Sequence, residues 1–576
     1  MHPAQFYEQH RIGIELSLAV VVTFVALRFP DAGGKWFHAV EEQLRRCAGR
    51  RRWSVLLVGA AALALRLAAL PIRPIPSPAG VDEQSYLFGA DTFASGRLTN
   101  PTHPMWTHFE TFHINQQPTY CSKFPPAQAV FLAAGEVIAG HPFWGVWLSD
   151  GLMCAAICWM LQGWFAPEWA LLGGLLVVMR LGVFNYWANS YFGGAVAAIG
   201  GALVLGALPR IKQRQRFRDA ALMGAGVAIL ANSRPYEGLI FSLPIAVALL
   251  VWMCRSGRPP MRGLGARVLL PLLLVLVPAG CAMGYYFWRT TGSPFLMPYQ
   301  VDSQAYDAAP YFLFQSLGPE PVYRFQVFRD LDRDWELQQY HAARSFPVRA
   351  ALLKFKLVYG FFLGGALGLP VLFAFVISLH RFRWKTIEPT LRFLAIVCAV
   401  MMAGFVVETF PGFPHYMAPI TGALIGLVLC AMQKLWPWRW QARPVGRFGV
   451  RASVLACFGL MLLHGVIGAG TPQRDFQYPG WWPRNRVRMT AAIEKLPGDQ
   501  LVIVRYTPDH DPAYDWVFNK PDIDQAKIVW ARDMGAAKNE ELIKYFKDRQ
   551  VWLLQADDAA PKLSPYTPHA EPAHLN

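Results

Sequence analysis

A series of apolar segments is the feature that most constrains the fold of this chain. A helix needs roughly 17–25 residues to cross the ~30 Å hydrocarbon core of a bilayer. The sequence predicts about twelve such spans, near residues 12–29, 54–72, 143–162, 168–184, 191–209, 219–233, 236–254, 267–287, 357–379, 392–409, 417–433 and 452–470. We therefore expect a polytopic α-helical membrane protein.

The composition supports a membrane protein and argues against a soluble protein that binds nucleic acid. The chain is 54% hydrophobic and 16% charged, with a mean hydropathy of +0.25, whereas soluble chains usually carry about 25% charged residues. The formal net charge is +16, but the basic residues fall in short clusters between apolar segments. That pattern follows the positive-inside rule. We therefore interpret the charge as topology, with membrane lipid as a partner and no nucleic acid.

The basic clusters also predict an orientation. They occur at 35–52, 210–218, 255–267, 381–392 and 434–451, which we place in the cytoplasm. The N-terminus and the two long loops, 73–142 and 289–356, then lie outside. The apolar run 124–140 cannot cross without reversing every later cluster, so we expect it to lie at the outer interface or to dip in and return.

Three parts of the chain differ in character. Residues 1–53 form an extra N-terminal span with a basic cytoplasmic loop, and 54–470 form the main transmembrane domain. The polar segment 471–576 contains strand-like runs at 501–506, 527–532 and 551–556, with a helix from Asn539 to Phe546. We expect a small α/β domain outside the cytoplasm, with at least one βαβ crossover.

The segment 81–126 concentrates ionisable and aromatic side chains between two apolar regions. Asp82 and Glu83 follow an apolar segment, and Lys123 precedes two prolines. Partial burial at such a boundary raises the basicity of a carboxylate, which then can take a proton from an incoming hydroxyl or amine. Lys123 is a cation that can neutralise a lipid phosphate. Simpler explanations stay open: surface charges at a helix end, and a lysine that extends to the interface.

Two other outer turns carry candidates. Arg234 lies at a break between short apolar segments, where a charge usually lines a cavity, and it is a second candidate ligand for phosphate. His415 and Tyr416 lie at another outer turn, although a lone histidine is more often a packed residue. The candidate substrate-binding residues are Tyr86, Arg97, Glu237, Tyr299, His415 and Tyr416.

These motifs resemble those of a known superfamily. Asp82-Glu83, Tyr86, Ala90 and Gly96 match a pattern DE-x-x-Y-x-x-x-A-x-x-x-x-x-G, and Lys123-x-Pro-Pro follows before a short apolar run. The chain is similar here to GT-C glycosyltransferases, in particular to the protein O-mannosyltransferase and lipid A aminoarabinose transferase group. Such enzymes move a sugar from a polyprenyl phosphate to a protein, lipid or glycan at the outer membrane face.

The resemblance implies roles for individual residues. Asp82 is the expected base, Lys123 the phosphate ligand, and Glu83 a supporting acid or acceptor contact. The aminoarabinose-type relatives have an acid directly before the lysine that contributes to a metal site, whereas this chain has Ser122 there. No cofactor is therefore certain, and the need for a divalent metal ion stays open.

The function expected from these features is an inverting glycosyltransferase with a polyprenyl-phosphate-linked donor and an acceptor outside the cytoplasm. We expect it in the bacterial inner membrane, with the site and the C-terminal domain on the periplasmic side. The alternatives are a multi-span transporter or lipid flippase with an outward-facing polar cavity, and a scaffold whose tail binds an envelope partner. Transporters usually place ionisable residues near mid-span, whereas here the polar residues concentrate in outer loops.

Overall fold

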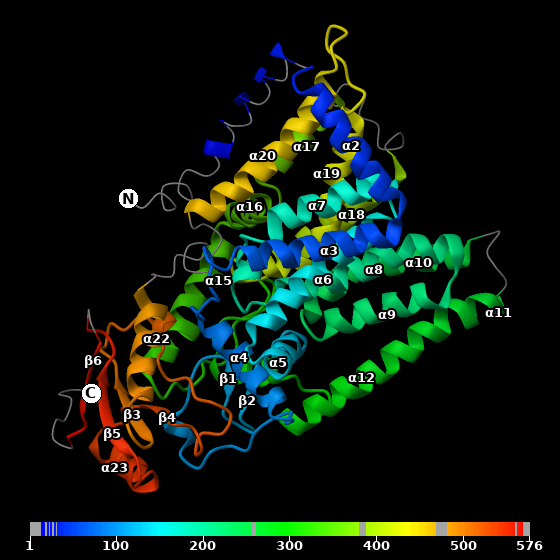
Figure 1. The fold of residues 1–576 in the computed structure, drawn as a ribbon. Helices are drawn as coiled ribbons and strands as arrows, with labels where there is room; N and C mark the ends of the chain where they lie inside the picture. Colours follow the sequence, from blue (N-terminus) through cyan, green and yellow to red (C-terminus); the bar gives the residue numbers. More distant parts are fainter. Residues whose placement is uncertain are drawn as a thin grey trace.

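The structure is a computed structural model that describes residues 31–255, 261–378, 388–467, 481–558 and 561–567, and scattered positions between 13 and 29. A helical bundle is joined at one end to a small sheet domain made by the C-terminal residues (Figure 1). Between them lie the helices and short strands of the loop 73–142 and part of the loop 289–356.

The bundle consists mostly of long apolar helices, together with one helix rich in charged residues, Gly34–Gly49, and one short helix of four residues, Met261–Leu264. They are α2 (Gly34–Gly49), α3 (Arg51–Ala68), α6 (Phe143–Leu161), α7 (Pro167–Leu181), α8 (Gly194–Arg214), α9 (Phe217–Ala231), α10 (Pro235–Cys254), α11 (Met261–Leu264), α12 (Leu270–Thr291), α16 (Pro347–Val358), α17 (Gly364–Ser378), α18 (Pro389–Val406), α19 (Thr421–Leu435) and α20 (Val445–Ile467). π-helical turns η3 (Gly265–Leu269) and η5 (Tyr359–Leu363) precede α12 and α17, and the 3-10 helix η8 (Pro414–Ile420) precedes α19.

The helices agree closely with the predicted spans. Eight helical segments of the described chain are long and apolar enough to cross a membrane. Three further predicted spans coincide with α3, α7 and α9, which have 18, 15 and 15 residues, and the span predicted at 12–29 falls mostly outside the described residues. The chain is thus a polytopic helical membrane protein.

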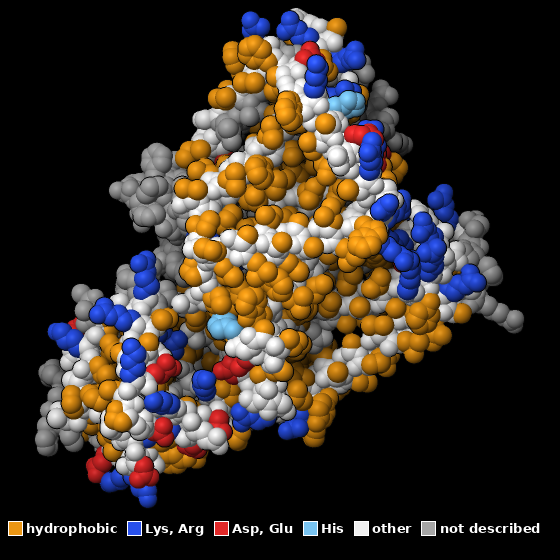
Figure 2. Space-filling model, in the orientation of Figure 1, with side chains coloured by type: hydrophobic (Ala, Val, Ile, Leu, Met, Phe, Trp, Pro, Cys, Tyr) orange, Lys and Arg blue, Asp and Glu red, His pale blue; other side chains and the backbone are white. Residues whose placement is uncertain are grey.

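The outer surface of the bundle also fits a lipid environment. Figure 2 shows a broad apolar face over the helices, with Lys and Arg side chains gathered beyond it at the edge where α8 and α10 end. On α12, large apolar side chains such as Leu270, Leu273 and Val277 are about half exposed. A contiguous apolar surface of this kind is unusual on a soluble monomer.

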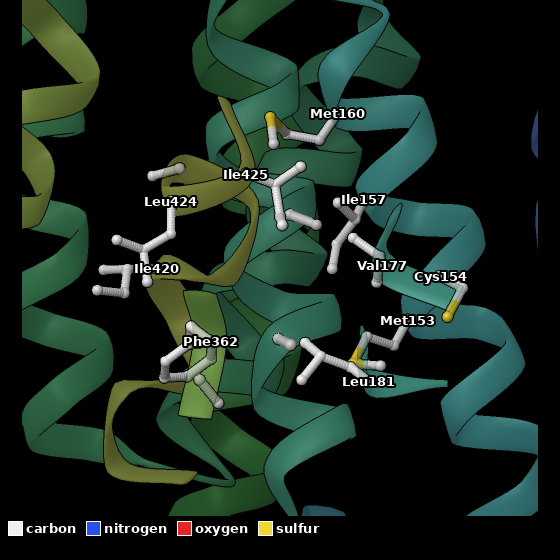
Figure 3. Close-up of a cluster of buried hydrophobic side chains, with 14 of the residues drawn as sticks. Met153, Cys154, Ile157, Met160, Val177, Leu181, Phe362, Ile420, Leu424 and Ile425 are labelled. Atoms are coloured by element: carbon white, nitrogen blue, oxygen red, sulfur yellow. The ribbon is translucent and has the colours of Figure 1, made fainter. Parts of the chain in front are cut away.

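Close helix packing forms the interior. Buried side chains from α6, α7, η5, η8 and α19, including Met153, Leu181 and Phe362, interdigitate at the centre of the bundle (Figure 3). At the crossing of α5 (Ala127–Ala139) and α6, a Cβ added to Gly135 would lie 2.1 Å from the backbone nitrogen of Gly145. Only glycine fits there, and it lets the two backbones touch.

The loop 73–142 is folded and not extended. It contains α4 (Val81–Ala94), the 3-10 turn η1 (Trp106–His108), a hairpin of β1 (Ile114–Asn115) and β2 (Cys121–Ser122), and α5. At 13 residues, α5 is only about 20 Å long. It is too short to cross the bilayer core, as expected for the run 124–140.

The loop 289–356 is largely helical. It contains α13 (Pro298–Tyr306), α14 (Gln326–Phe328), the π-helix η4 (Arg329–Trp335) and α15 (Glu336–Ser345). Asn115 of β1 donates a hydrogen bond to the carbonyl of Pro298, 2.9 Å away. The two loops therefore meet directly.

The C-terminal domain is a small α/β unit, as predicted, and its sheet has four strands. It consists of α22 (Trp481–Glu494), β3 (Gln500–Arg505), η9 (Pro512–Tyr514), β4 (Ile528–Arg532), α23 (Ala536–Tyr545), β5 (Gln550–Gln555) and β6 (Lys562–Pro565). The strand order is β4-β3-β5-β6, with β3 parallel to both β4 and β5. The segment β4-α23-β5 is the expected crossover.

One detail of this domain was predicted wrongly. We expected Asn539 to cap its helix, but α23 begins at Ala536 and Asn539 is fully buried inside the first turns. Its side chain reaches back, accepting from the N–H of Met534 and donating to Asp533. The strand β6 was not predicted, because Lys562–Pro565 is too short and polar to show a strand pattern.

An interface joins this domain to the loop 73–142. It consists of Glu110 and Thr111 from the loop and Asp515 and Arg532 from the domain, and we call it the clamp. Arg532 is buried, pairs with Asp515 at 2.5 Å and donates to the carbonyl oxygen of Glu110. Thr111 in turn donates to Asp515 at 3.1 Å. A shared apolar cluster surrounds the clamp, with members from the loop and from the domain such as Phe109, Ile114, Leu501 and Leu542. The domain and the loop therefore fold against one another.

Candidate active site

The first turn of α4 carries Asp82 and Glu83. Gly80 adopts the extended conformation that precedes the helix, and two acidic residues in the first turn are favourable next to the helix dipole. The two side chains point to different surroundings. Glu83 is fully buried, and its carboxylate accepts hydrogen bonds from the backbone N–H groups of Ala79, Gly80 and Tyr191.

Backbone groups from two parts of the chain surround Glu83. Its acceptors are occupied by backbone donors, two at the start of α4 and one in the turn before α8. Burial raises the pKa of Glu83 to about 7, although the three hydrogen bonds oppose that rise. The carboxylate thereby joins α4 to a neighbouring turn, and the expected part of Glu83 as a supporting acid or acceptor contact stays a prediction.

Asp82 instead faces a histidine. Its carboxylate oxygen lies 2.6 Å from Nδ1 of His113, and both side chains are about one fifth exposed. His113 has φ +62°, in the left-handed region. Its carbonyl oxygen accepts from the backbone N–H of Lys123 and the hydroxyl of Ser85. A non-glycine residue held in this region is often found at functional sites.

The electrostatics of Asp82 differ from the expectation. We expected partial burial to raise its pKa. Burial does act in that direction, but the charges of His113, Lys123 and Arg234 outweigh it and hold the pKa below its usual value. Asp82 is therefore a carboxylate kept ionised by surrounding cations.

Lys123 is buried next to the hairpin and fixed by the other loop. Its Nζ lies 2.8 Å from Asp302 of α13 and 5.3 Å from the centre of the Tyr299 ring. Burial opposes its charge, but Asp302 and then Asp307 outweigh that effect and raise the pKa of Lys123 well above its usual value. Lys123 is therefore a permanent cation in a defined orientation.

Arg234 supplies the second cation. It precedes Pro235, the first residue of α10, and its guanidinium lies 3.6 Å from Glu237 and 4.5 Å from the centre of the Tyr416 ring. Burial would lower the pKa of Arg234, but Tyr86 and Glu237 outweigh it and raise the pKa. The adjacent turn joins α5 through a hydrogen bond from Ala127 N–H to the carbonyl of Asn232.

The side chain of Tyr86 is close enough to the charged groups described above to be affected by their charges. Its ring stacks on Phe124 at 4.4 Å. Burial raises the pKa of its hydroxyl to about 12, and the charged groups that act on it are Arg234, Asp82, Glu237 and Lys123. The charges of Asp82, Lys123 and Arg234 thus all act on the Tyr86 hydroxyl.

Two predicted residues lie elsewhere. Arg97 follows the C-terminal end of α4, about 20 Å along the helix from Asp82 at 1.5 Å per residue. His415 is buried between the rings of Phe192 and Phe413, at 5.0 and 5.4 Å, and its Nδ1 lies 2.8 Å from the Tyr186 hydroxyl. His415 is a packed residue behind Tyr416.

The sequence analysis assigned no role to the acidic residues of the loop 289–356. Besides Asp302, the loop 289–356 brings three carboxylates together, from Asp307, Asp332 and Glu336, and one oxygen of each lies within 4.8 Å of the others. His113 was likewise not assigned a role. The spacing of Asp332 and Glu336 on one helical face was the only signal available for this group.

The fold and the site together define a membrane-embedded helical protein with an ionised carboxylate and two fixed cations beside an extramembrane domain. No protein-family model matches the sequence, and no curated protein matches it. Solved structures do resemble the fold. ArnT from Cupriavidus metallidurans bound to undecaprenyl phosphate has 15% identity and a TM-score of 0.48, covering 87% of this chain and 93% of that one.

The same protein in the apo state has 14% identity and a TM-score of 0.49, covering 87% and 92% of the two chains. The Archaeoglobus fulgidus oligosaccharyltransferase in the apo form has 10% identity and a TM-score of 0.44, covering 88% and 69%. Both neighbours are GT-C glycosyltransferases.

Proposed function

We propose that this protein is an inverting glycosyltransferase that moves a sugar from a polyprenyl-phosphate-linked donor to an acceptor outside the cytoplasm. The observation that carries the proposal is the Asp82 carboxylate, kept ionised by His113 at 2.6 Å and by Lys123 and Arg234. An anionic base next to two fixed cations is the charge pattern that displacement of a phosphate from a sugar requires.

The chemistry uses one carboxylate. The hydroxyl or amine of the acceptor attacks the anomeric carbon of the donor sugar from the face opposite the phosphate. The bond from that carbon to the phosphate oxygen breaks, and its electron pair leaves with the polyprenyl phosphate. The acceptor proton passes to Asp82. A single displacement inverts the anomeric configuration.

The two cations have complementary roles toward the leaving group. The ammonium of Lys123 has three N–H donors, of which one is directed to Asp302, so two are available for a phosphate oxygen. Arg234 presents a planar guanidinium whose plane is set by the Tyr416 ring and Glu237. Together they stabilise the negative charge that grows on the departing phosphate, which needs no proton.

The location suits a lipid-linked donor. Asp82 and Lys123 lie in the loop 73–142, where α4 and the short apolar helix α5 adjoin the bundle (Figure 1). A polyprenyl chain can stay in the bilayer while its phosphate reaches this edge. The positive-inside pattern of the basic clusters supports a periplasmic location for this edge.

A transfer assay tests the proposal. The purified full-length protein, in lipid nanodiscs, is incubated with a panel of polyprenyl-phosphate sugars and candidate acceptors. We expect release of free polyprenyl phosphate from at least one donor and an inverted linkage in the product. Movement of an intact donor across the bilayer without bond cleavage would instead support the flippase alternative, and a retained configuration would contradict the single displacement.

A further inference from the structure

The three carboxylates of the loop 289–356, which we call the acidic triad, come from separate elements. Asp307 ends α13, Asp332 lies within the π-helix η4, and Glu336 begins α15. The backbone N–H of Ala308 donates to the carbonyl of Asp332 at 2.9 Å, which fixes the end of α13 against η4. The wider turn of a π-helix is rare and occurs mostly at functional sites.

The triad has too little positive charge around it. Among the described residues, no Lys or Arg forms an ion pair with any of its three members, and the nearby Lys123 is already paired with Asp302. Burial raises the pKa of each member, and nearby carboxylates, Asp302 in the case of Asp307, add to the rise; the pKa of Glu336 reaches about 11. Three anions in a buried space need a compensating cation or must stay protonated.

One atom of the triad lacks any partner. Oε2 of Glu336 is buried and has no hydrogen-bond donor in the described part of the protein, and the residue is 8% exposed. Asp332 is also buried, at 5% exposure. Buried polar atoms are nearly always satisfied, so an oxygen left open beside two other carboxylates marks a place for a ligand.

We propose that Asp307, Asp332 and Glu336 bind one divalent cation of the hard, oxygen-preferring class to which Mg²⁺, Mn²⁺ and Ca²⁺ belong. The donor set contains only carboxylate oxygens, and water completes the coordination. This site is separate from the position before Lys123, where Ser122 offers no carboxylate.

The cation has a structural consequence for the candidate active site. Asp307 follows directly on α13, the helix that also carries Asp302 and Tyr299, the partners of Lys123. A cation held between Asp307 and η4 fixes α13 and thereby the orientation of the Lys123 ammonium. Only this last step depends on the proposed transferase function.

Binding of Mn²⁺ tests the site without any activity measurement. The full-length protein, stripped with a chelator, is titrated with Mn²⁺ and followed by electron paramagnetic resonance, with Mg²⁺ and Ca²⁺ as competitors. We expect one saturable site per chain, with an affinity reduced by at least about tenfold in D332N and in E336Q. The matched control is D334N, because Asp334 lies on the same helical turn, is exposed and pairs with Arg333.

Thermal unfolding provides a second readout that also reports folding. In the chelator, D332N should unfold at the same or a higher temperature than the wild type, because it removes repulsion among buried anions. With Mn²⁺ present, the wild type and D334N should gain stability and D332N should not. Absence of saturable binding in the wild type, or equal binding in D332N, overturns the site. The transfer assay is separate, so its failure leaves this result intact.

Discussion

Two groups of carboxylates flank Lys123, and their surroundings are opposite. Asp82 lies against His113 and is acted on by Lys123 and Arg234, so its pKa is lowered in spite of burial. The members of the acidic triad have raised pKa values, because they are buried near other carboxylates and the nearby Lys123 is already paired with Asp302. The same functional group is therefore prepared for different tasks by its neighbours.

The comparison shows how to distinguish a base from a cation ligand in a buried site. A carboxylate held ionised by fixed protein cations can accept a proton at once when substrate arrives. A cluster of buried carboxylates without such cations must bind a cation or stay protonated. The predictions below separate the two sides of Lys123 by changing one at a time.

Removing the base should have the largest effect. D82N keeps the size of the side chain but cannot take a proton at neutral pH, so the transfer rate kcat should fall by about 10²–10⁴-fold while donor binding persists. The measurement is single-turnover transfer together with donor affinity. The neighbouring variant E83Q should chiefly lower the unfolding temperature, since it loses an acceptor for buried backbone N–H groups. Equal losses of rate in both would contradict the assignment.

Substitution of Lys123 should have the second-largest effect on activity. Its effect on the rate can be separated from its effect on stability. K123M should reduce kcat by about 10²–10³-fold, as loss of one charge-stabilising donor does in other enzymes. It also leaves Asp302 buried and unpaired, which costs about 3–5 kcal/mol of stability. The double variant K123M/D302N should recover much of the stability but not the rate. Recovery of the rate would show that Lys123 is only structural.

The His113 contact should control the pH dependence. Activity requires ionised Asp82, so it is lost as pH falls through the Asp82 pKa. H113Q removes the largest effect that lowers this pKa, leaving burial to raise it, and the acid limb of kcat/KM should shift to higher pH. Profiles of wild type and H113Q across the acidic to neutral range check this. An unchanged limb would indicate that another group sets it.

Changing Arg97 should have the smallest effect. R97Q alters a side chain at the far end of α4 from Asp82, so kcat and KM should stay within about twofold of the wild type, as for ordinary surface substitutions. Steady-state kinetics on the same donor provide the measurement. A loss comparable to that of K123M would place a second substrate-binding region at the C-terminal end of α4.

The transmembrane part of the fold could be predicted from the sequence because hydropathy alone determines it. Helices lie on the predicted spans from α3 to α20, and the βαβ unit of the C-terminal domain follows from its short apolar runs. The misplaced helix start at Asn539 has a physical cause. A polar residue suited to a cap is satisfied equally well inside a helix when its side chain finds buried partners.

The site could be predicted only where a residue is marked by its local sequence. Asp82, Lys123 and Arg234 border apolar segments and prolines, so they were visible. Asp302 was not, because its partner Lys123 is 179 residues away in the chain. The direction of the Asp82 pKa was missed for the same reason. Burial is suggested by the adjacent apolar residues, whereas the opposing charge of His113 comes from a loop conformation.

The clamp has a further consequence for control of the protein. Arg532 holds the carbonyl of Glu110, and three residues later the same loop presents His113 to Asp82. A nanobody or peptide that separates the C-terminal domain from this loop would release His113 from its position beside Asp82. Turnover would then slow, although the inhibitor does not occupy the candidate active site. The clamp is thus a target outside the candidate active site, and an inhibitor directed at it does not need to resemble a sugar or a lipid.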